Sequence, residues 1–246
     1  MNISKETVKR IVNDVKFIKN NTINNIFYKH DEENILNGYA IIIGNKDTPY
    51  EYGFYLFHFK FPTNYPYSPP TIKYMTNDGY MRFNPNLYTD GKVCLSVLNT
   101  WHGDGWSSCQ SIYSILIVLL NILNANPLLN EPGINIINYK NSIDKYNLLV
   151  SYKNIEYSII KQLKILCNLT NKDNNKDITN YLCLKKILID IFKNNKNNIL
   201  NNLNLIENDI NKLCKNNYIY INTYNLECFL NINKLKFDIN DLYNNI

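Results

Sequence analysis

The chain has 246 residues, 45% of them hydrophobic, which is enough to bury one large domain or one ordinary domain with an appendage. Residues 1–133 balance eleven basic against eleven acidic side chains, so the net charge of +5 comes from residues 134–246, with fifteen lysines against ten acids. A dispersed lysine excess without an aromatic-basic motif is typical of a solvated surface, and we therefore expect no nucleic-acid partner.

The six cysteines are scattered at positions 94, 109, 167, 183, 214 and 228, without the C-x-x-C spacing of a zinc site or a compact disulfide pattern. We expect no metal and no cofactor. The polar, helix-patterned N-terminus does not resemble a signal peptide, and the longest purely aliphatic run, residues 115–120, is too short to span a bilayer. These features predict no membrane partner and a reducing compartment, the cytoplasm with the nucleus as an additional location.

Residues 4–20 have the pattern of an amphipathic helix that Ser4 can cap, with apolar side chains recurring on one face. Basic side chains lie largely on the other side, among them Lys5, Lys9 and Arg10. On its own, this pattern fits an exposed, solvated basic face.

Four strands are predicted next, at about residues 24–30, 39–44, 54–61 and 71–76. The third alternates, with Tyr55, Phe57 and Phe59 on one face, and this places His58 on the opposite face, near solvent. The short linkers favour an antiparallel meander.

Residues 81–106 hold the residues that most suggest chemistry. Cys94 lies in a short apolar run, three residues after the turn pair Asp90-Gly91 and eight residues after Asn86. A thiol and an amide at this spacing suggest a nucleophile and an oxyanion donor. The local pattern also fits a simpler interpretation, in which Cys94 is a core residue and Asn86 a turn amide.

All eight glycines and all eight prolines lie at or before Gly133, so the remainder should be mostly helical. Ser107 and Gln110 can form a capping box for a helix whose buried stripe runs from 112 to 123. Further helices are predicted at about 141–168, 181–192 and 199–213 and near the C-terminus, with a loop at 171–176. Residues 218–230 are ambiguous and can form a short strand.

Several motifs between residues 49 and 133 occur in an order that resembles the ubiquitin-conjugating enzyme family, especially its larger members with a C-terminal extension. They are YPxxPP at 65–70, NPN at 84–86, GKVCL at 91–95, tryptophans at 101 and 106, and NEPG at 130–133. The resemblance implies an α+β fold: a four-stranded antiparallel meander packed on helices in a core domain, residues 4–168, followed by a mainly helical extension, residues 169–246. The family usually has His where this chain has Asn84, a change expected to affect loop stability more than chemistry.

The resemblance also implies a function and site residues. Cys94 would accept ubiquitin or a ubiquitin-like protein as a thioester and pass it to a substrate lysine or to a ligase. Asn86 would stabilise the oxyanion, and Glu131 would orient or deprotonate the incoming lysine. Glu131 can equally serve only to cap the turn that follows it.

Partner-binding residues follow from the same resemblance. Lys5, Lys9 and Arg10 on the first helix would help to dock the activating enzyme, whereas Tyr67 and Ser108 would belong to the surface for ubiquitin ligases. Every motif tied to thioester chemistry ends by Gly133, so residues 169–246 are predicted to be dispensable for accepting ubiquitin.

Two other classes of function stay open at this point. One is an inactive module that binds ubiquitin or a ligase, which the presence of both Cys94 and Asn86 disfavours. The other is a cysteine hydrolase using Cys94 and His102, for which the sequence offers no orienting carboxylate or amide.

Overall fold

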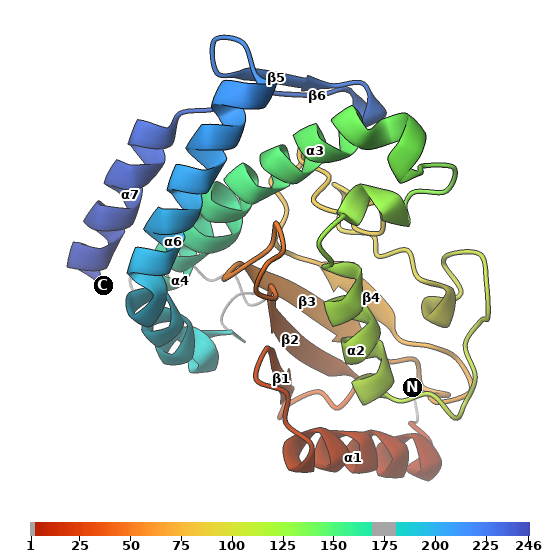
Figure 1. Cartoon of the computed structure of the whole chain (residues 1–246). Coiled ribbons are helices and arrows are strands. Elements are labelled where there is room, and N and C mark those ends of the chain that lie inside the picture. The colour runs from red at the N-terminus through yellow and green to blue at the C-terminus, as the bar shows by residue number, and fades with distance from the viewer. Residues whose placement is uncertain (1–2, 169–180) are drawn as a thin grey trace.

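The computed structural model describes residues 3–168 and 181–246, and its centre is a four-stranded antiparallel sheet in the order β1-β2-β3-β4 (Figure 1). The strands are β1 (Ile26–His30), β2 (Asn37–Ile43), β3 (Phe54–Lys60) and β4 (Thr71–Tyr74). The predicted meander is therefore confirmed. The loop predicted at 171–176 lies outside the described residues.

Helices surround this sheet. They are α1 (Lys5–Asn20), α2 (Ile112–Ile122), α3 (Ile136–Lys153), a π-helical segment (Asn154–Lys161) and α4 (Gln162–Asn168), with short 3-10 helices at Ser96–Leu98 and Pro127–Asn130. As predicted, Ser4 caps α1, because its hydroxyl accepts a 3.0 Å hydrogen bond from the Thr7 amide. Helix α3, the π-helical segment and α4 follow one another directly along the chain and form one long helical rod.

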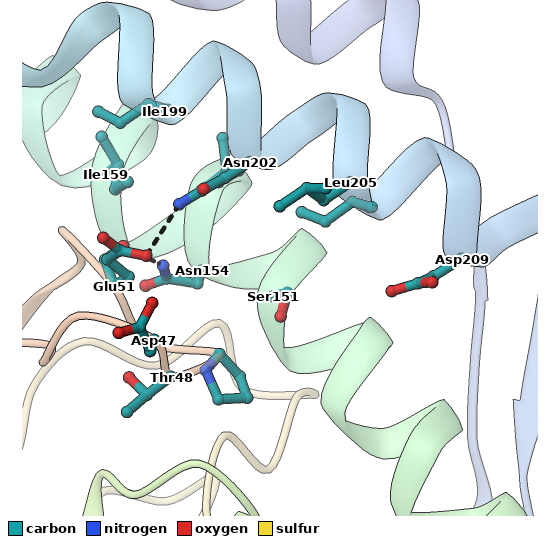
Figure 2. Close-up of a pocket in the computed structure, with 13 residues that line it drawn as sticks. Asp47, Thr48, Glu51, Ser151, Asn154, Ile159, Ile199, Asn202, Leu205 and Asp209 are labelled. Atoms are coloured by element: carbon teal, nitrogen blue, oxygen red, sulfur yellow. Dashed lines mark hydrogen bonds between the residues drawn. The ribbon is translucent and has the colours of Figure 1, made fainter.

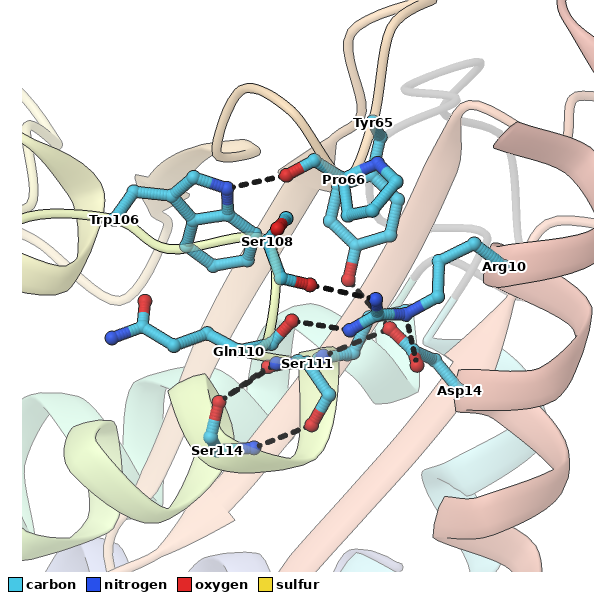
Figure 3. Close-up of polar contacts among 10 residues, drawn as sticks. Arg10, Asp14, Tyr65, Pro66, Trp106, Ser108, Gln110, Ser111 and Ser114 are labelled. Carbon is cyan, nitrogen blue, oxygen red and sulfur yellow. Dashed lines mark hydrogen bonds and ion pairs between the residues drawn. The ribbon is translucent and has the colours of Figure 1, made fainter. Parts of the chain in front are cut away.

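The predicted capping box for α2 is wrong. The cap is Ser111, which accepts a hydrogen bond from the Ser114 amide while its own amide donates to the Ser114 hydroxyl. Ser107 to Gln110 stay outside the helix. The carbonyls of Ser108 and Gln110 instead accept hydrogen bonds from the Arg10 guanidinium, which holds this segment as a loop (Figure 3).

The expectation that His58 lies near solvent is also wrong, because β3 is buried on both faces up to Lys60. His58 is 7% exposed and stacks on Tyr39 at 4.8 Å between ring centroids. Tyr39 in turn meets the edge of Tyr181, which comes from the C-terminal part of the chain. A segment more than a hundred residues downstream therefore helps to cover this face of the sheet.

The C-terminal part consists of a 3-10 turn (Leu182–Leu184), helix α6 (Lys185–Leu213), the hairpin β5 (Tyr218–Ile221) and β6 (Leu226–Phe229), and helix α7 (Ile232–Asn245). The two helices predicted at 181–192 and 199–213 are one continuous helix. The ambiguous segment does contain a strand, and the terminal helix is present. Helices α6 and α7 lie along the rod of α3 and α4, and the hairpin lies near the beginning of α3 (Figure 1).

The C-terminal part packs closely on the rest of the chain. One buried apolar cluster contains side chains of both segments, for example Leu163 and Leu166 of α4 with Phe192 and Leu203 of α6. Above the loop at 47–51, α3 and α6 line a cavity of about 240 Å³ (Figure 2).

The boundary at residue 168 stays a prediction. Within 3–168 and 181–246, no helix combines the length and the apolar character needed to cross a membrane.

Candidate active site

Cys94 lies in a buried segment but is not a member of the main apolar cluster. Its neighbours Val93 and Leu95 both belong to the buried cluster, whereas Cys94 does not, although it is only 2% exposed. The backbone at Leu95 is extended, and in extended backbone the side chains of successive residues point to opposite sides. The burial of Cys94 fits the core interpretation, and its role as a nucleophile stays a prediction.

Asn86 and Cys94 are held together by two hydrogen bonds. The Cys94 amide donates to the Asn86 carbonyl at 2.9 Å, and the Asn86 side-chain amide donates to the Cys94 carbonyl at 2.8 Å. A side-chain amide has two N–H donors, so one remains for a further acceptor. The spacing of eight residues thus brings the amide directly beside the backbone of Cys94.

Asn84 is the centre of the hydrogen bonds that support this pair. It is fully buried and donates to the Tyr50 hydroxyl at 2.9 Å and to the Ile122 carbonyl at 2.8 Å. Its side-chain oxygen accepts from the Asn86 amide at 2.9 Å and from the Asn130 side chain at 3.4 Å. These contacts connect position 84 to the loop, and its larger effect on stability than on chemistry stays a prediction.

The segment after Cys94 is shaped by polar contacts. The Thr100 hydroxyl accepts from the Leu95 amide at 2.9 Å and contacts the Val93 carbonyl at 2.9 Å. Gly103 adopts φ of 120°, and a Cβ there would lie 3.3 Å from the Ser96 Cβ, so this position favours glycine. The loop is thereby folded back over the residues that follow the thiol.

Glu131 contacts a residue of the C-terminal part. Its half-buried carboxylate accepts a hydrogen bond from the Tyr224 hydroxyl, while its carbonyl caps the following turn by accepting from the Ile134 amide at 3.2 Å. The role of Glu131 toward an incoming lysine stays a prediction. Asn130, the preceding residue, connects this turn to Asn84.

The Arg10 guanidinium is bound by groups of the protein, although its side chain is 24% exposed. Its guanidinium forms an ion pair with Asp14 at 2.9 Å and donates to the carbonyls of Ser108 and Gln110 (Figure 3). The other oxygen of Asp14 accepts from the Tyr65 hydroxyl at 2.5 Å. Burial and this hydrogen bond raise the pKa of Tyr65 above its usual value, so it remains a donor.

The other predicted partner-binding residues are more accessible. Lys5 and Lys9 are exposed on α1, and Ser108 is exposed in the loop before α2. Tyr67 is 65% exposed and donates to Glu6 at 2.8 Å. Trp106 joins the two loops, because its indole N–H donates to the Pro66 carbonyl at 2.6 Å (Figure 3). The roles of these residues in binding partners stay predictions.

Neither hydrolase nor metal chemistry gains support from the geometry. His102 is exposed, and its ring lies 6.2 Å from that of Trp101, on the outer loop. Among the residues that the structure describes, no group of three His, Cys, Asp or Glu side chains is arranged to hold a metal ion.

Sequence reasoning missed several residues of this site. Asn130 donates a hydrogen bond to the Ile122 carbonyl, and Thr100 donates one to the Leu95 carbonyl, next to Cys94. Arg82 donates at 2.7 Å to the Pro85 carbonyl, next to Asn86. The bond from Asn130 to Asn84 spans 46 residues, whereas the contacts of Arg82 and Thr100 are short-range but follow no recognised motif. Tyr224 gave no signal of a site either, although the asparagines on both sides of it favour a turn.

Comparison with known proteins finds a matching family model and several relatives with similar sequences. The family model described as "Ubiquitin-conjugating enzyme" matches residues 10–150. Ubiquitin-conjugating enzyme E2 Z of Xenopus tropicalis is 38% identical over 165 residues, covering 67% of this chain and 53% of that protein. The human protein of the same name is 38% identical over 159 residues, covering 64% and 45%. This chain thus spans about half the length of these curated relatives.

Two further similarities concern shorter stretches. The human dual E2 ubiquitin-conjugating enzyme/E3 ubiquitin-protein ligase BIRC6 is 46% identical over 114 residues, which are 44% of this chain and 2% of that protein. The solved structure of human ubiquitin-conjugating enzyme E2 G1 superposes with a TM-score of 0.43 and 25% identity, covering 48% of this chain and 94% of that one.

Proposed function

The chain belongs to the ubiquitin-conjugating enzyme family, and from this premise we propose that Cys94 accepts ubiquitin or a ubiquitin-like protein as a thioester and transfers it onward. The observation that carries the proposal is the mutual pair of hydrogen bonds between Cys94 and Asn86. It fixes a thiol-bearing backbone beside an amide donor, on a loop that Asn84 holds in place.

The first step is an exchange of thioesters. The Cys94 thiol loses its proton and attacks the thioester carbonyl of ubiquitin bound to the activating enzyme. The new C–S bond forms, the old C–S bond breaks, and the departing thiolate of the activating enzyme takes up a proton. A thiol with ordinary acidity suffices, because the donor is already an activated acyl group.

The second step is transfer to an amine or to another thiol. A substrate lysine, once deprotonated, attacks the Cys94 thioester through a tetrahedral oxyanion; an amide bond forms, the C–S bond breaks, and Cys94 regains its proton. The second N–H of the Asn86 amide is a suitable donor to that oxyanion. Transfer to a ligase cysteine is again thioester exchange.

The proposal includes partners. An acidic activating enzyme is suited to the exposed Lys5 and Lys9, and ligases to the surface formed by Tyr67 and Ser108. Protein substrates supply the lysine. We place these events in the cytoplasm, and in the nucleus as a second location, in keeping with the scattered cysteines.

The test is incubation with activating enzyme, ATP and ubiquitin, read on a non-reducing gel. The expected product is an adduct of chain and ubiquitin that a reducing agent removes. The exposed Cys109 supplies the control: a Cys109→Ser chain should form the same adduct. A wild-type chain that forms no adduct would indicate a binding module, and release of free ubiquitin from conjugates would indicate a hydrolase.

A further inference from the structure

The C-terminal part of the chain contributes a side chain to a cluster that contacts the loop before Asn86, through Arg82 and Pro85. Tyr224 lies in the 3-10 turn Thr223–Asn225, between the two strands of the hairpin, and donates its hydroxyl hydrogen to the Glu131 carboxylate. The two residues are 93 positions apart. The contact therefore joins the hairpin to the turn that follows the Pro127–Asn130 helix.

The backbone at Tyr224 is unusual. Its φ is 67°, in the left-handed region that tyrosine seldom adopts, and Asn225 follows with φ of 49°. An unfavourable backbone conformation that persists indicates that the surroundings determine it. Here the surroundings include the tight turn that joins Ile221 to Leu226 as well as the partners of the tyrosine side chain.

Those partners fix both the ring and the hydroxyl. The Arg82 guanidinium lies between two rings, 3.9 Å from the centroid of Tyr88 and 4.4 Å from that of Tyr224. Arg82 also donates to the Pro85 carbonyl at 2.7 Å, immediately before Asn86. Burial, followed by the hydrogen bond to Glu131, raises the pKa of Tyr224, so the hydroxyl stays protonated at neutral pH.

Two separate sets of contacts thus connect Tyr224, Arg82 and Glu131 to the loop that holds Asn86 and Cys94. One runs through Arg82 to Pro85. The other runs from Glu131 through its neighbour Asn130, whose side chain donates to Asn84, and Asn84 accepts from the Asn86 amide. A half-buried carboxylate at this location can attract the ammonium group of an incoming lysine.

We propose that Tyr224 is a positioning residue, which holds the Glu131 carboxylate in the orientation that receives the substrate lysine at the Cys94 thioester. This inference rests on the function proposed above. It makes the C-terminal extension a supplier of one part of the catalytic arrangement for amine acceptors.

Single-turnover discharge of the ubiquitin-charged full chain tests the role of Tyr224. The variant is Tyr224→Phe, which keeps the ring on Arg82 and removes only the hydroxyl. The matched control is Tyr218→Phe, since Tyr218 lies in the same hairpin and donates to a different glutamate, Glu227, at 2.6 Å. Discharge is measured against lysine concentration and, separately, against a small thiol, which carries no ammonium group for Glu131 to receive.

We expect Tyr224→Phe to lower the rate at saturating lysine by about tenfold, the loss expected for one hydrogen bond to a charged group. The half-saturating lysine concentration should change little, because the carboxylate is still present and only its orientation is lost. Discharge to the thiol, loading and the melting temperature should equal those of Tyr218→Phe.

A second comparison asks whether Tyr224 acts through Glu131. The double variant Glu131→Gln/Tyr224→Phe should discharge to lysine no more slowly than Glu131→Gln alone. The inference would be overturned if the double variant were slower than Glu131→Gln alone. It would also be overturned if Tyr224→Phe lowered the discharge rates to lysine and to thiol equally, or lowered neither. Failure of the wild-type chain to load ubiquitin would instead overturn the proposed function itself.

Discussion

The side-chain amide of Asn86 donates a 2.8 Å hydrogen bond to the carbonyl of Cys94, and the Cys94 amide returns a 2.9 Å hydrogen bond to the Asn86 carbonyl. The Asn86 amide and the residue that bears the thiol thus belong to one hydrogen-bonded unit. Pre-organised donors of this kind stabilise charge without reorganisation during the reaction.

Asn86→Ala should separate the two half-reactions. Discharge to free lysine should slow by about 10²-fold, because the oxyanion loses its donor. Loading should change far less, since the activating enzyme supplies stabilisation of its own. Single-turnover assays of both steps measure the difference, and a melting curve controls for unfolding of the loop. Equal losses in the two steps would leave Asn86 a turn residue.

Cys94→Ser should accept ubiquitin as an oxygen ester that survives thiol treatment. The hydroxyl still forms an acyl bond, but an ester is less readily displaced than a thioester. Gel analysis with and without a reducing agent distinguishes the two products. If the Cys94→Ser chain gave a thiol-sensitive adduct, another cysteine would be the acceptor.

Asn84→Ala should affect stability more than either reaction step. The substitution leaves the Asn86 amide without its acceptor in a fully buried site, at a cost of about 2–3 kcal/mol in the free energy of unfolding. Urea titration measures this cost. Asn130→Ala is the matched comparison, with a smaller expected loss, because the Ile122 carbonyl keeps its bond from Asn84. A larger loss for Asn130→Ala would contradict the central position of Asn84.

Phe192→Ala should destabilise the sheet-containing part of the chain, although it lies on α6. Phe192 is fully buried in the cluster shared by both segments, and its loss should cost about 3–5 kcal/mol. Both tryptophans, Trp101 and Trp106, lie far away in the N-terminal segment. Their fluorescence should therefore report a lower melting temperature.

The control for this prediction is Leu205→Ala, on the same helix but 63% exposed. It should leave the transition unchanged. An unaltered tryptophan transition in Phe192→Ala, with early loss of helical circular dichroism, would mean that residues 169–246 melt as a separate unit. That outcome would support the boundary at residue 168.

Stability should decline toward acid partly through His30. Burial lowers the pKa of His30, outweighing the opposite effects of the Ile35 carbonyl and Asp31. The unfolded chain then binds the proton at higher pH than the folded chain. The free energy of unfolding therefore falls as the pH drops from the unfolded pKa of about 6.5 toward the lowered folded value. His30→Gln should show a smaller decline, as melting curves at several pH values can measure.

Local patterns were sufficient for much of the fold. Apolar periodicity predicted α1 and the four strands, and the spacing of Asn86 and Cys94 correctly brought these residues together. These features depend on residues near in sequence, where side-chain period and turn chemistry dominate.

Long-range contacts decided the rest. The Arg10 guanidinium keeps Ser108 and Gln110 in a loop, so the cap of α2 moves to Ser111. Tyr181 helps to cover the face that carries His58, which alternation within β3 alone could not reveal.

The contact between Tyr224 and Glu131 could not be predicted either. It requires the hairpin to dock near the start of α3 (Figure 1), a matter of tertiary packing rather than of local sequence.

The contacts of Arg10 with Asp14, Ser108 and Gln110 reduce the share of the Arg10 charge in the electrostatic attraction of an approaching protein. The guanidinium is already compensated by Asp14 and by two carbonyls, whereas Lys5 and Lys9 are exposed. Long-range attraction to an acidic partner should therefore depend on the lysines and weaken as ionic strength rises. Arg10 would influence the same encounter through the shape of the neighbouring loop, an effect that salt leaves largely intact.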